Sequence, residues 1–438
     1  MTRDRKRRNA MQSNAMSNAI RKRRLVGSLA WFAVGAQVVV LLLLRGSEAF
    51  SYERFVANAK IFEPSTAPRP DYLVVMPDFA VEVPFVRITR PGKTLGAGGV
   101  CDKAYCRHRY SSTQAWNADQ SLLVITNGCH GMCFLDGTTF EPLFHRSMTD
   151  DCKWHPQDAA RMLCVRRDRI FWWVPRTNAQ RTAFSPSDLS DMQFGPYKGN
   201  LSLDGTRMVV RARKADGRAI AFALDVETGQ RHAEIDVDRI PGANGYCGIS
   251  PSGQFIACFQ NLPNGVDTAH IFTLEGRESQ HWHEHHRPGH GDMAIDADDN
   301  DVYVGISKAD PDKWHVIKRR LKDGQVTVLA PAGYATHAST RNILRPSWVF
   351  LSYEGSREKI GAQPGWAPFY QEVVALRIDG SGEVRRVART RNAKHDYESE
   401  THASPSPDGT RVIWASNWGV PGGPVADYVS LVAWPDSR

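Results

Sequence analysis

The chain has 438 residues, of which 42% are hydrophobic and 23% are charged, enough for one large core or for an array of small sheets. Its formal net charge is +8, but nine of the 55 Lys and Arg residues, and only one of the 47 acidic residues, lie in residues 1–24. The remaining chain therefore carries 46 charged residues of each sign, which argues against nucleic acid as a partner of the folded part.

Residues 25–44, LVGSLAWFAVGAQVVVLLLL, contain no charged residue. Twenty residues with a rise of about 1.5 Å each match a hydrocarbon core about 30 Å thick, so we expect a transmembrane helix. The basic residues 1–24 predict a cytoplasmic tail, a single-pass membrane protein and a periplasmic or extracellular location for the rest of the chain. Residues 47–49 (SEA) weakly resemble a signal-peptidase site, so a cleaved signal peptide is the alternative to an uncleaved signal anchor.

Residues 45–71 have the composition of a stalk or linker, and the folded domain is expected over residues 72–438. A recurring pattern follows, in which a polar turn precedes a short strand rich in Val, Ile and aromatic residues. Seven copies occur, at residues 117–127, 156–166, 202–212, 250–260, 296–306, 341–353 and 401–419. A repeat of about 40–50 residues with four short strands each is typical of an all-β fold, the β-propeller.

The last repeat has sequence for only three strands, the third at residues 428–434. A closed ring leaves no open sheet edge, so we expect a strand from residues 72–89 to supply the missing fourth strand. The sequence thus predicts a seven-bladed β-propeller, with six or eight blades as the alternatives if one boundary is misplaced.

Eight cysteines occur as four close pairs, which is typical of disulfide bonds in an oxidising compartment. The pairs are Cys101/Cys106, Cys129/Cys133, Cys152/Cys164 and Cys247/Cys258. The spacing does not fix the connectivity.

Histidines recur where the first strand of a blade enters the central channel. His290, His337 and His402 come from three successive repeats, so their imidazoles are expected to converge. Three imidazoles can hold a divalent metal, for which Zn, Mn or Ca are the candidates, and the alternative is a packed polar cap without metal. The run of histidines that begins at His281 is expected to lie on an outer, solvated edge.

A second group of polar residues lies in the first three repeats. His108 is flanked by Arg107 and Arg109, and further members are His130, Tyr197, Lys198, Arg211 and Arg213. Abstraction of a proton next to a carboxylate needs a base and a cation that neutralises the carboxylate, and His, Tyr and Arg supply both.

With these residues the chain resembles the propeller-fold polysaccharide lyases, most closely the ulvan lyases and more distantly the oligogalacturonate lyases. Ulvan lyases carry two histidines, then a tyrosine and an arginine, and here His108 and His130 are 22 residues apart, while Tyr197 and Arg213 are 16 apart. The resemblance implies a catalytic role for these four residues and for Tyr246 as a second tyrosine. It also implies that His290, His337 and His402 are similar to the metal-binding histidines of oligogalacturonate lyases, whose glutamine ligand has no evident counterpart here. The repeats are also similar to those of TolB-like propellers.

Two functions therefore compete. The first is a membrane-anchored, monomeric lyase that cleaves a uronate-containing acidic polysaccharide by β-elimination, with Arg107, Arg109, Lys198 and Arg211 binding the substrate. The second is a non-catalytic, TolB-like propeller that binds a protein or an envelope glycan. The fold alone does not decide between them.

Overall fold

The computed structural model describes residues 67–79, 81–195, 199–261, 267–282, 289–307, 315–331, 335–354 and 369–435. Apart from Pro435 they belong to one compact unit, Phe55–Trp434. The predicted basic tail, the predicted membrane span and most of the predicted stalk lie outside these residues. Within the described ranges, no helix has the length and apolar character needed to cross a membrane.

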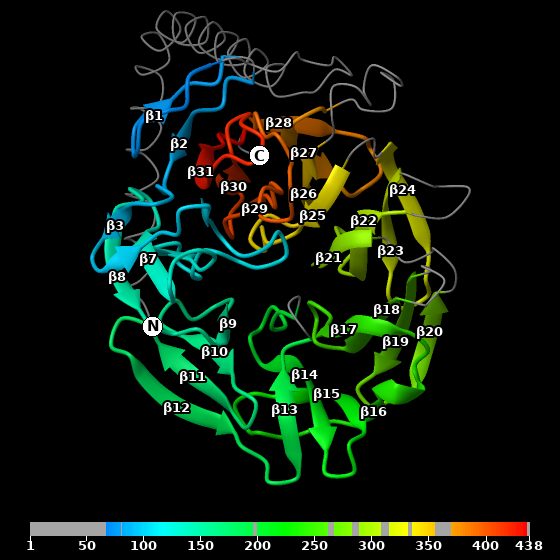
Figure 1. Cartoon of the computed structure of the whole chain (residues 1–438). Helices are drawn as coiled ribbons and strands as arrows, with labels where there is room; N and C mark the ends of the chain where they lie inside the picture. Colours follow the sequence, from blue (N-terminus) through cyan, green and yellow to red (C-terminus); the bar gives the residue numbers. More distant parts are fainter. Residues whose placement is uncertain are drawn as a thin grey trace, which may run out of the picture. The chain divides into compact units, whose positions relative to one another are not determined.

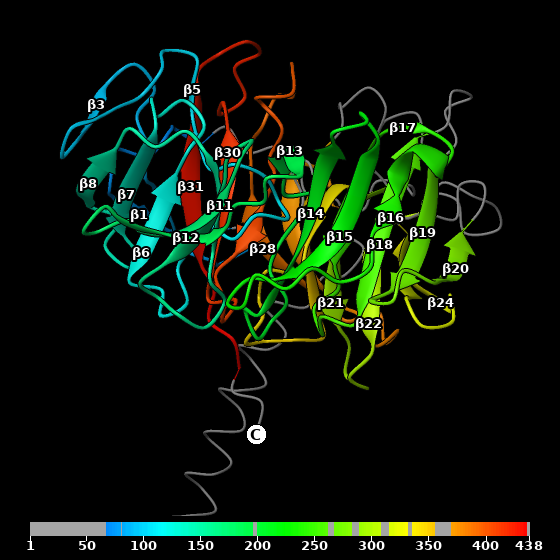
Figure 2. The same ribbon diagram turned by 90° about the horizontal axis from the view of Figure 1, so that it is seen from below.

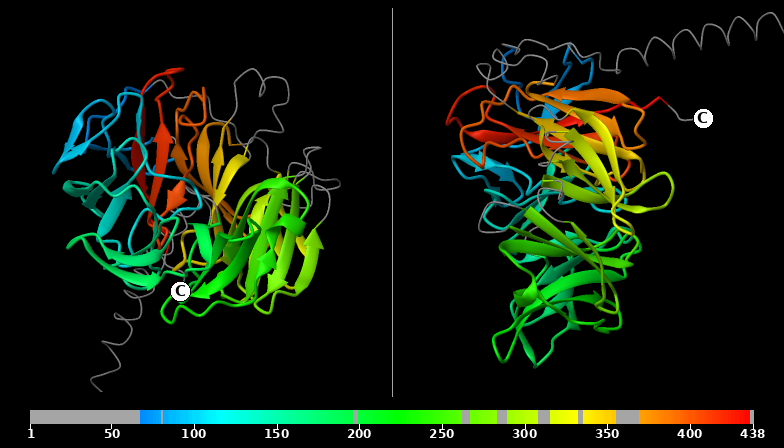
Figure 3. Two further views of the ribbon diagram at one scale, coloured as in Figure 1. Left: turned by 60° about the horizontal axis from the view of Figure 1, so that its bottom comes forward. Right: turned by 90° about the vertical axis from the view of Figure 1, so that its right-hand side faces the viewer.

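Seven of the eight sheets are arranged as blades around a central channel, which confirms the predicted seven-bladed propeller (Figure 1), and the eighth is a two-stranded hairpin. The side views in Figures 2 and 3 show neighbouring blades packed face to face. Blade 1 contains β6 (Leu122–Ile125), β7 (Met132–Asp136) and β8 (Pro142–Arg146), and an isolated bridge between Trp116 and Leu123 adds the segment nearest the channel.

Five blades each contain four antiparallel strands in one sheet. Blade 2 has β9 (Asp151–Trp154), β10 (Met162–Val165), β11 (Ile170–Val174) and β12 (Ala179–Phe184). Blade 3 has β13 (Leu189–Gln193), β14 (Arg207–Lys214), β15 (Ala219–Asp225) and β16 (Ile235–Asp236), followed by the 3₁₀ helix η1 (Val237–Arg239). Blade 4 has β17 (Ala243–Ile249), β18 (Phe255–Asn261), β19 (Asp267–Thr273) and β20 (Glu278–Trp282). Blade 5 has β21 (Gly289–Ile295), β22 (Asp301–Ile306), β23 (His315–Arg320) and β24 (Val326–Pro331). Blade 6 has β25 (Ala335–Ser339), β26 (Trp348–Tyr353), β27 (Glu372–Arg377) and β28 (Val384–Arg389).

Blade 7 joins the two ends of the described chain. Its strands β29 (Ser404–Pro405), β30 (Arg411–Ser416) and β31 (Val425–Leu431) are followed in the sheet by β2 (Phe85–Arg87) and β1 (Val75–Met76). Strand β2 pairs with β31 in the register Val86 to Val429, which confirms the predicted closure by an N-terminal strand. In Figure 1 the blue β2 lies beside the red β31. A hairpin of β3 (Thr94–Gly96) and β4 (Gly99–Val100) follows, and β5 (Tyr105–Cys106) runs parallel to β31.

The middle strands are buried on both faces because each blade packs between two others. All six residues of β22 and all six of β26 are buried, whereas β12, at the outer edge, is mostly exposed. Burial on both faces explains why the sequences of the middle strands are continuous apolar runs, without a clear alternation of polar and apolar residues.

A set of hydrogen bonds that recurs within the chain fixes the turn before β30. The Asp408 carboxylate accepts hydrogen bonds from the Ser406 hydroxyl at 2.7 Å and from the Thr410 backbone N–H at 2.9 Å. Gly409 has a φ of +72°, a conformation that a side chain disfavours. The same contacts recur before β14, with Ser202, Asp204, Gly205 and Thr206. The repeated S-x-D-G-T motif is therefore a turn signal of this fold.

The eight cysteines form four disulfides, each between successive cysteines of the chain: Cys101–Cys106, Cys129–Cys133, Cys152–Cys164 and Cys247–Cys258. The last two join directly paired residues of the first two strands of blades 2 and 4. The predicted disulfide bonds are thus confirmed, and the structure supplies the connectivity that the spacing did not fix.

The closing strand generates a stability prediction. The Val86→Asp substitution should lower the free energy of unfolding by about 3 kcal/mol or more, because it places an unpaired carboxylate at a position that is only 2% exposed and packs in the core. Val75→Asp, on the neighbouring β1, should change it by less than about 0.5 kcal/mol because Val75 is 56% exposed. Denaturant unfolding measures both, and equal effects would show that β2 does not close the ring.

Candidate metal centre in the channel

Three histidines from blades 5, 6 and 7 lie together in the channel. The ring centroids of His337 and His402 are 4.1 Å apart, and those of His290 and His337 are 5.0 Å apart. His337 and His402 are buried, while His290 is exposed. The ring of Tyr110 packs against His402 at 4.7 Å, and its hydroxyl lies 3.5 Å from Nδ1 of His290. The three predicted metal ligands are therefore neighbours.

Glu400 completes a compact donor set with two of these histidines. Its Oε2 atom lies 3.5 Å from Nε2 of His337 and 3.5 Å from Nε2 of His402. A tetrahedral site with bonds of about 2.1 Å separates its ligand atoms by about 3.4 Å. The separations thus match those around one metal ion. In this set Glu400 takes the place that was predicted for His290, whose exposed ring lies against His337.

The protonation and the surroundings of the His402 imidazole suit a metal ligand. Burial, followed by the nearby His337 and Arg107, lowers the pKa of His402 well below its ordinary value, so its imidazole is neutral at neutral pH. Both of its ring nitrogens are buried and make no hydrogen bond to any described residue. Buried polar atoms are rarely left without partners, and a metal ion supplies one. The residues present therefore fit a divalent ion.

The backbone at two of the histidines is strained. His290 has a φ of 50° and His402 has a φ of 45°, in the left-handed region that residues other than glycine seldom adopt. Such conformations cost about 1–3 kcal/mol and cluster at functional sites. The backbone conformation of these two histidines therefore costs stability, a pattern typical of functional sites.

Lys394 forms ion pairs with both Glu400 and Glu354. The Lys394 ammonium lies 2.5 Å from Oε1 of Glu400 and 3.4 Å from Oε2 of Glu354. Burial raises the pKa of Glu354 to about 7, and Glu354 accepts a hydrogen bond from the Thr401 backbone N–H at 2.8 Å. These contacts fix the segment that carries Glu400 and His402.

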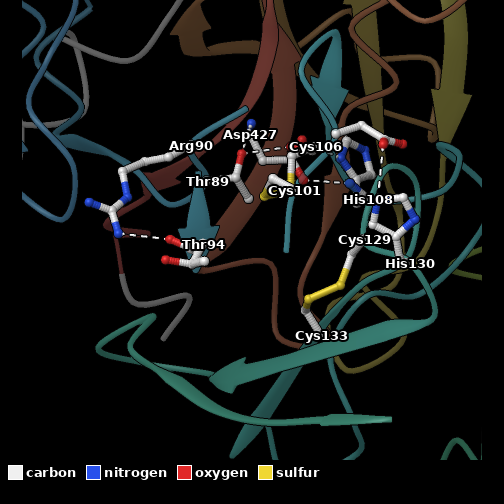
Figure 4. Close-up of a disulfide and its surroundings, with 11 residues drawn as sticks. Thr89, Arg90, Thr94, Cys101, Cys106, His108, Cys129, His130, Cys133 and Asp427 are labelled. Atoms are coloured by element: carbon white, nitrogen blue, oxygen red, sulfur yellow. Dashed lines mark hydrogen bonds and ion pairs between the residues drawn. A yellow bond between two sulfur atoms is a disulfide. The ribbon is translucent and has the colours of Figure 1, made fainter. Parts of the chain in front are cut away.

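His108 contacts the backbone of His402, and Figure 4 shows its ring beside Asp427. Its Nε2 atom lies 2.6 Å from the His402 carbonyl oxygen, and its Nδ1 atom lies 2.8 Å from the Asp427 carboxylate. Both neighbours are acceptors, so both hydrogen bonds form only when each ring nitrogen carries a proton. His108 is 1% exposed. This environment suits a positioning residue, and the predicted role of His108 as a catalytic base stays a prediction.

His130 lies in a different environment from His108. Its side chain is 65% exposed, and its Nε2 atom lies 3.1 Å from the Asp102 carboxylate. Figure 4 shows it next to the Cys129–Cys133 disulfide, at the start of β7. The structure therefore places the two histidines in different environments, His108 buried and His130 exposed.

The flanking arginines are both engaged in ion pairs. Arg107 is fully buried and contacts Glu398 at 2.7 Å, and it also donates to the carbonyl oxygens of His108 and Arg109. Arg109 pairs with Asp151 and lines an open pocket of about 530 Å³. Next to it, burial lowers the pKa of Lys153 to about 8.

The predicted residues of blades 3 and 4 have other contacts. Arg211 donates to the Gly245 carbonyl at 2.8 Å, and the exposed Arg213 donates to the Gly217 carbonyl at 2.9 Å in the β14–β15 turn. Tyr246 is buried, with its hydroxyl 3.0 Å from that of Tyr303. Tyr197 and Lys198 lie outside the described residues. No described contact joins this group to the channel histidines.

Sequence reasoning missed Glu400, Tyr110, Asp427 and Lys153. Glu400 precedes His402 by two residues, a spacing that places two side chains on the same face of an extended segment. That spacing was the available signal. Asp427 carried none, because its role depends on the pairing of β31 with the N-terminal strand.

The fold and the centre define a β-propeller whose channel presents two imidazoles and a carboxylate. The sequence matches no protein-family profile and no curated protein. Among solved structures, the chain is similar to an oligogalacturonate lyase in complex with manganese, with a TM-score of 0.56 and 15% identity, over 82% of this chain and 96% of that one. It is similar to an oligogalacturonate lyase from Vibrio parahaemolyticus with a TM-score of 0.56 and 11% identity, over the same shares.

TolB from Acinetobacter baumannii matches with a TM-score of 0.38 and 13% identity, over 73% of this chain and 78% of that one. At these identities the likeness shows the fold alone. It supports the predicted distant resemblance to oligogalacturonate lyases, and the predicted closer resemblance to ulvan lyases is not shown.

The buried His108 and the exposed His130 should respond differently to the loss of their carboxylate partners. Asp427→Asn should lower the free energy of unfolding by about 1–3 kcal/mol, because it replaces the buried carboxylate that hydrogen-bonds to the ring and the backbone N–H of His108. It should also weaken metal binding by about 10–100-fold, because His108 holds the carbonyl of His402.

The matched control is Asp102→Asn, which removes the exposed partner of His130 and should change stability by less than about 0.5 kcal/mol. Denaturant unfolding and metal titration measure the two effects. Unchanged metal affinity in Asp427→Asn would contradict the positioning role of His108.

Proposed function

We propose that this protein is a lyase that cleaves a uronate-containing acidic oligosaccharide or polysaccharide by β-elimination at the channel centre. The observation that carries the proposal is the position of Glu400, whose Oε2 atom lies 3.5 Å from Nε2 of both His337 and His402. The fold shared with oligogalacturonate lyases supports it, and so does the manganese bound by one of them.

The reaction removes the proton at C5 of the uronate and breaks the C4–O bond, which leaves a C4–C5 double bond. The leaving oxygen takes up a proton. A divalent ion held by His337, Glu400 and His402 would supply a positive charge that offsets the negative charge developing on the substrate carboxylate as the C5 proton leaves. The chain must supply the base and the acid.

We assign the base to His290 and the proton relay to Tyr110. The His290 imidazole is exposed at the channel, so a substrate can reach it, and the Tyr110 hydroxyl lies 3.5 Å from its Nδ1 atom. The buried His108 has no such access, because both of its nitrogens face protein acceptors. This scheme assigns no role to the other predicted catalytic residues, His130, Tyr197, Arg213 and Tyr246.

We also propose that the propeller is anchored to a membrane by residues 25–44 and acts on the non-cytoplasmic side. The uncharged run of twenty residues and the nine basic residues before it support this location. Four disulfides are typical of a protein exposed to an oxidising compartment.

The full chain in detergent, incubated with a panel of uronate polymers, should release products with the ultraviolet absorbance of unsaturated uronates. His337→Ala and Glu400→Gln should lower kcat/KM by at least about 100-fold, since each removes a ligand of the metal. A chelator should have the same effect, and added Mn²⁺ should reverse it. His232→Ala, on the outer part of blade 3, is the control and should retain the activity of the parent.

His290→Ala should lower kcat by about 10²–10⁴-fold and leave polymer binding nearly unchanged, because proton transfer takes place only in the transition state. Steady-state kinetics and a binding titration separate the two effects. Normal turnover in this variant would exclude His290 as the base. If the parent itself cleaves no polymer of the panel, the alternative of a binding propeller is favoured.

A further inference from the structure

A second group of metal-ligating side chains lies on the outer edge of blade 4. His270 comes from β19, and Glu278 and His281 come from β20. One nitrogen from each histidine and one carboxylate oxygen all lie within 4.8 Å of one another. The Glu278 Oε1 atom is 2.8 Å from Nδ1 of His270 and 3.9 Å from Nδ1 of His281. Figure 1 shows β19 and β20 at the rim of the ring, away from the central β25 and β29.

The strand pairing explains why these three side chains share one face. His270 and His281 are direct cross-strand partners, and their rings are 4.0 Å apart. Glu278 is three residues from His281, so a regular strand would place it on the opposite face. The register shifts between Ile271 and Phe272, which brings Glu278 opposite Phe272. This β-bulge turns the Glu278 carboxylate toward the histidines, a use of bulges that is common at functional sites.

The cluster is buried at His270 and more exposed at Glu278 and His281. The side chain of His270 is only 5% exposed, whereas those of His281 and Glu278 are 34% and 42% exposed. The Nδ1 atom of His270 faces the Glu278 carboxylate at 2.8 Å, and the ring of His281 lies tilted against that of His270. A buried imidazole, a second imidazole beside it and a carboxylate at their common edge together present the donor atoms of a metal site.

We propose that His270, Glu278 and His281 form a second binding site for a divalent transition metal of the Zn²⁺ type. Two imidazoles and one carboxylate are the protein ligands that such ions accept, with water in the remaining position. The bound ion joins β20 to β19 and so secures the outer edge of blade 4. This site is separate from the channel centre and does not depend on the proposed lyase activity.

Zn²⁺ alone, titrated into the metal-free full chain, should bind with two equivalents per protein. His281→Ala and Glu278→Gln should each remove one equivalent, or weaken it by at least about 100-fold, and His337→Ala should remove the other. The double variant His281→Ala/His337→Ala should bind none. The exposed His281 and Glu278 are chosen so that the buried His270 and the fold stay intact, which circular dichroism of the metal-free variants checks.

The histidines that follow in the sequence require their own control. The triple variant His283→Ala/His285→Ala/His286→Ala should retain both equivalents. The proposal is overturned if the triple variant loses the second equivalent, or if His281→Ala in the His337→Ala background still binds Zn²⁺ as tightly as His337→Ala alone. In that background, Zn²⁺ should raise the Tm of the protein with His281 present and leave it unchanged in the His281→Ala variant.

Discussion

The Asp427 side chain connects the closure of the ring to the channel centre. Its backbone N–H donates to the Thr89 hydroxyl at 2.8 Å, which ties β31 to the chain that follows β2. Its carboxylate accepts from His108, and the ring of His108 in turn contacts the carbonyl oxygen of His402 at 2.6 Å. The two ends of the propeller must therefore meet correctly before His402 can take its strained conformation. The closure of the ring and the geometry of the channel site therefore depend on the same contacts.

The fold was predictable because each blade repeats a physical signal. A turn with Asp and Gly precedes a buried apolar strand, and this signal is strongest before β14 and β30, where the Asp204 and Asp408 carboxylates bind the backbone of the turn. The closing strand was predictable from the deficit of one strand in the last repeat. The hairpin of β3 and β4, the parallel pairing of β5 and the bulge in β20 were not, since none of them follows from periodicity.

The candidate site was predictable only in part. His337 and His402 stand at the entry of the first strand of their blades, and the propeller geometry brings such positions together. The spacing of the other predicted site residues did not show which way their side chains face. His130 lies in an exposed turn, and the exposed Arg213 is at the end of β14 beside the next turn, positions that their spacing in the sequence did not indicate. A carboxylate can complete such a shell, but residues 396–400 (DYESE) hold three acidic residues, and the sequence did not single out Glu400 among them.

The order of the disulfides along the chain has a consequence for biogenesis. Eight cysteines allow about a hundred pairings, yet each cysteine here bonds to the next one in the sequence. When such a chain emerges from a translocation channel with its N-terminal part first, the correct partner of each odd-numbered cysteine is the next thiol to arrive. An oxidase that joined cysteines in order of appearance would make all four native bonds without the help of an isomerase.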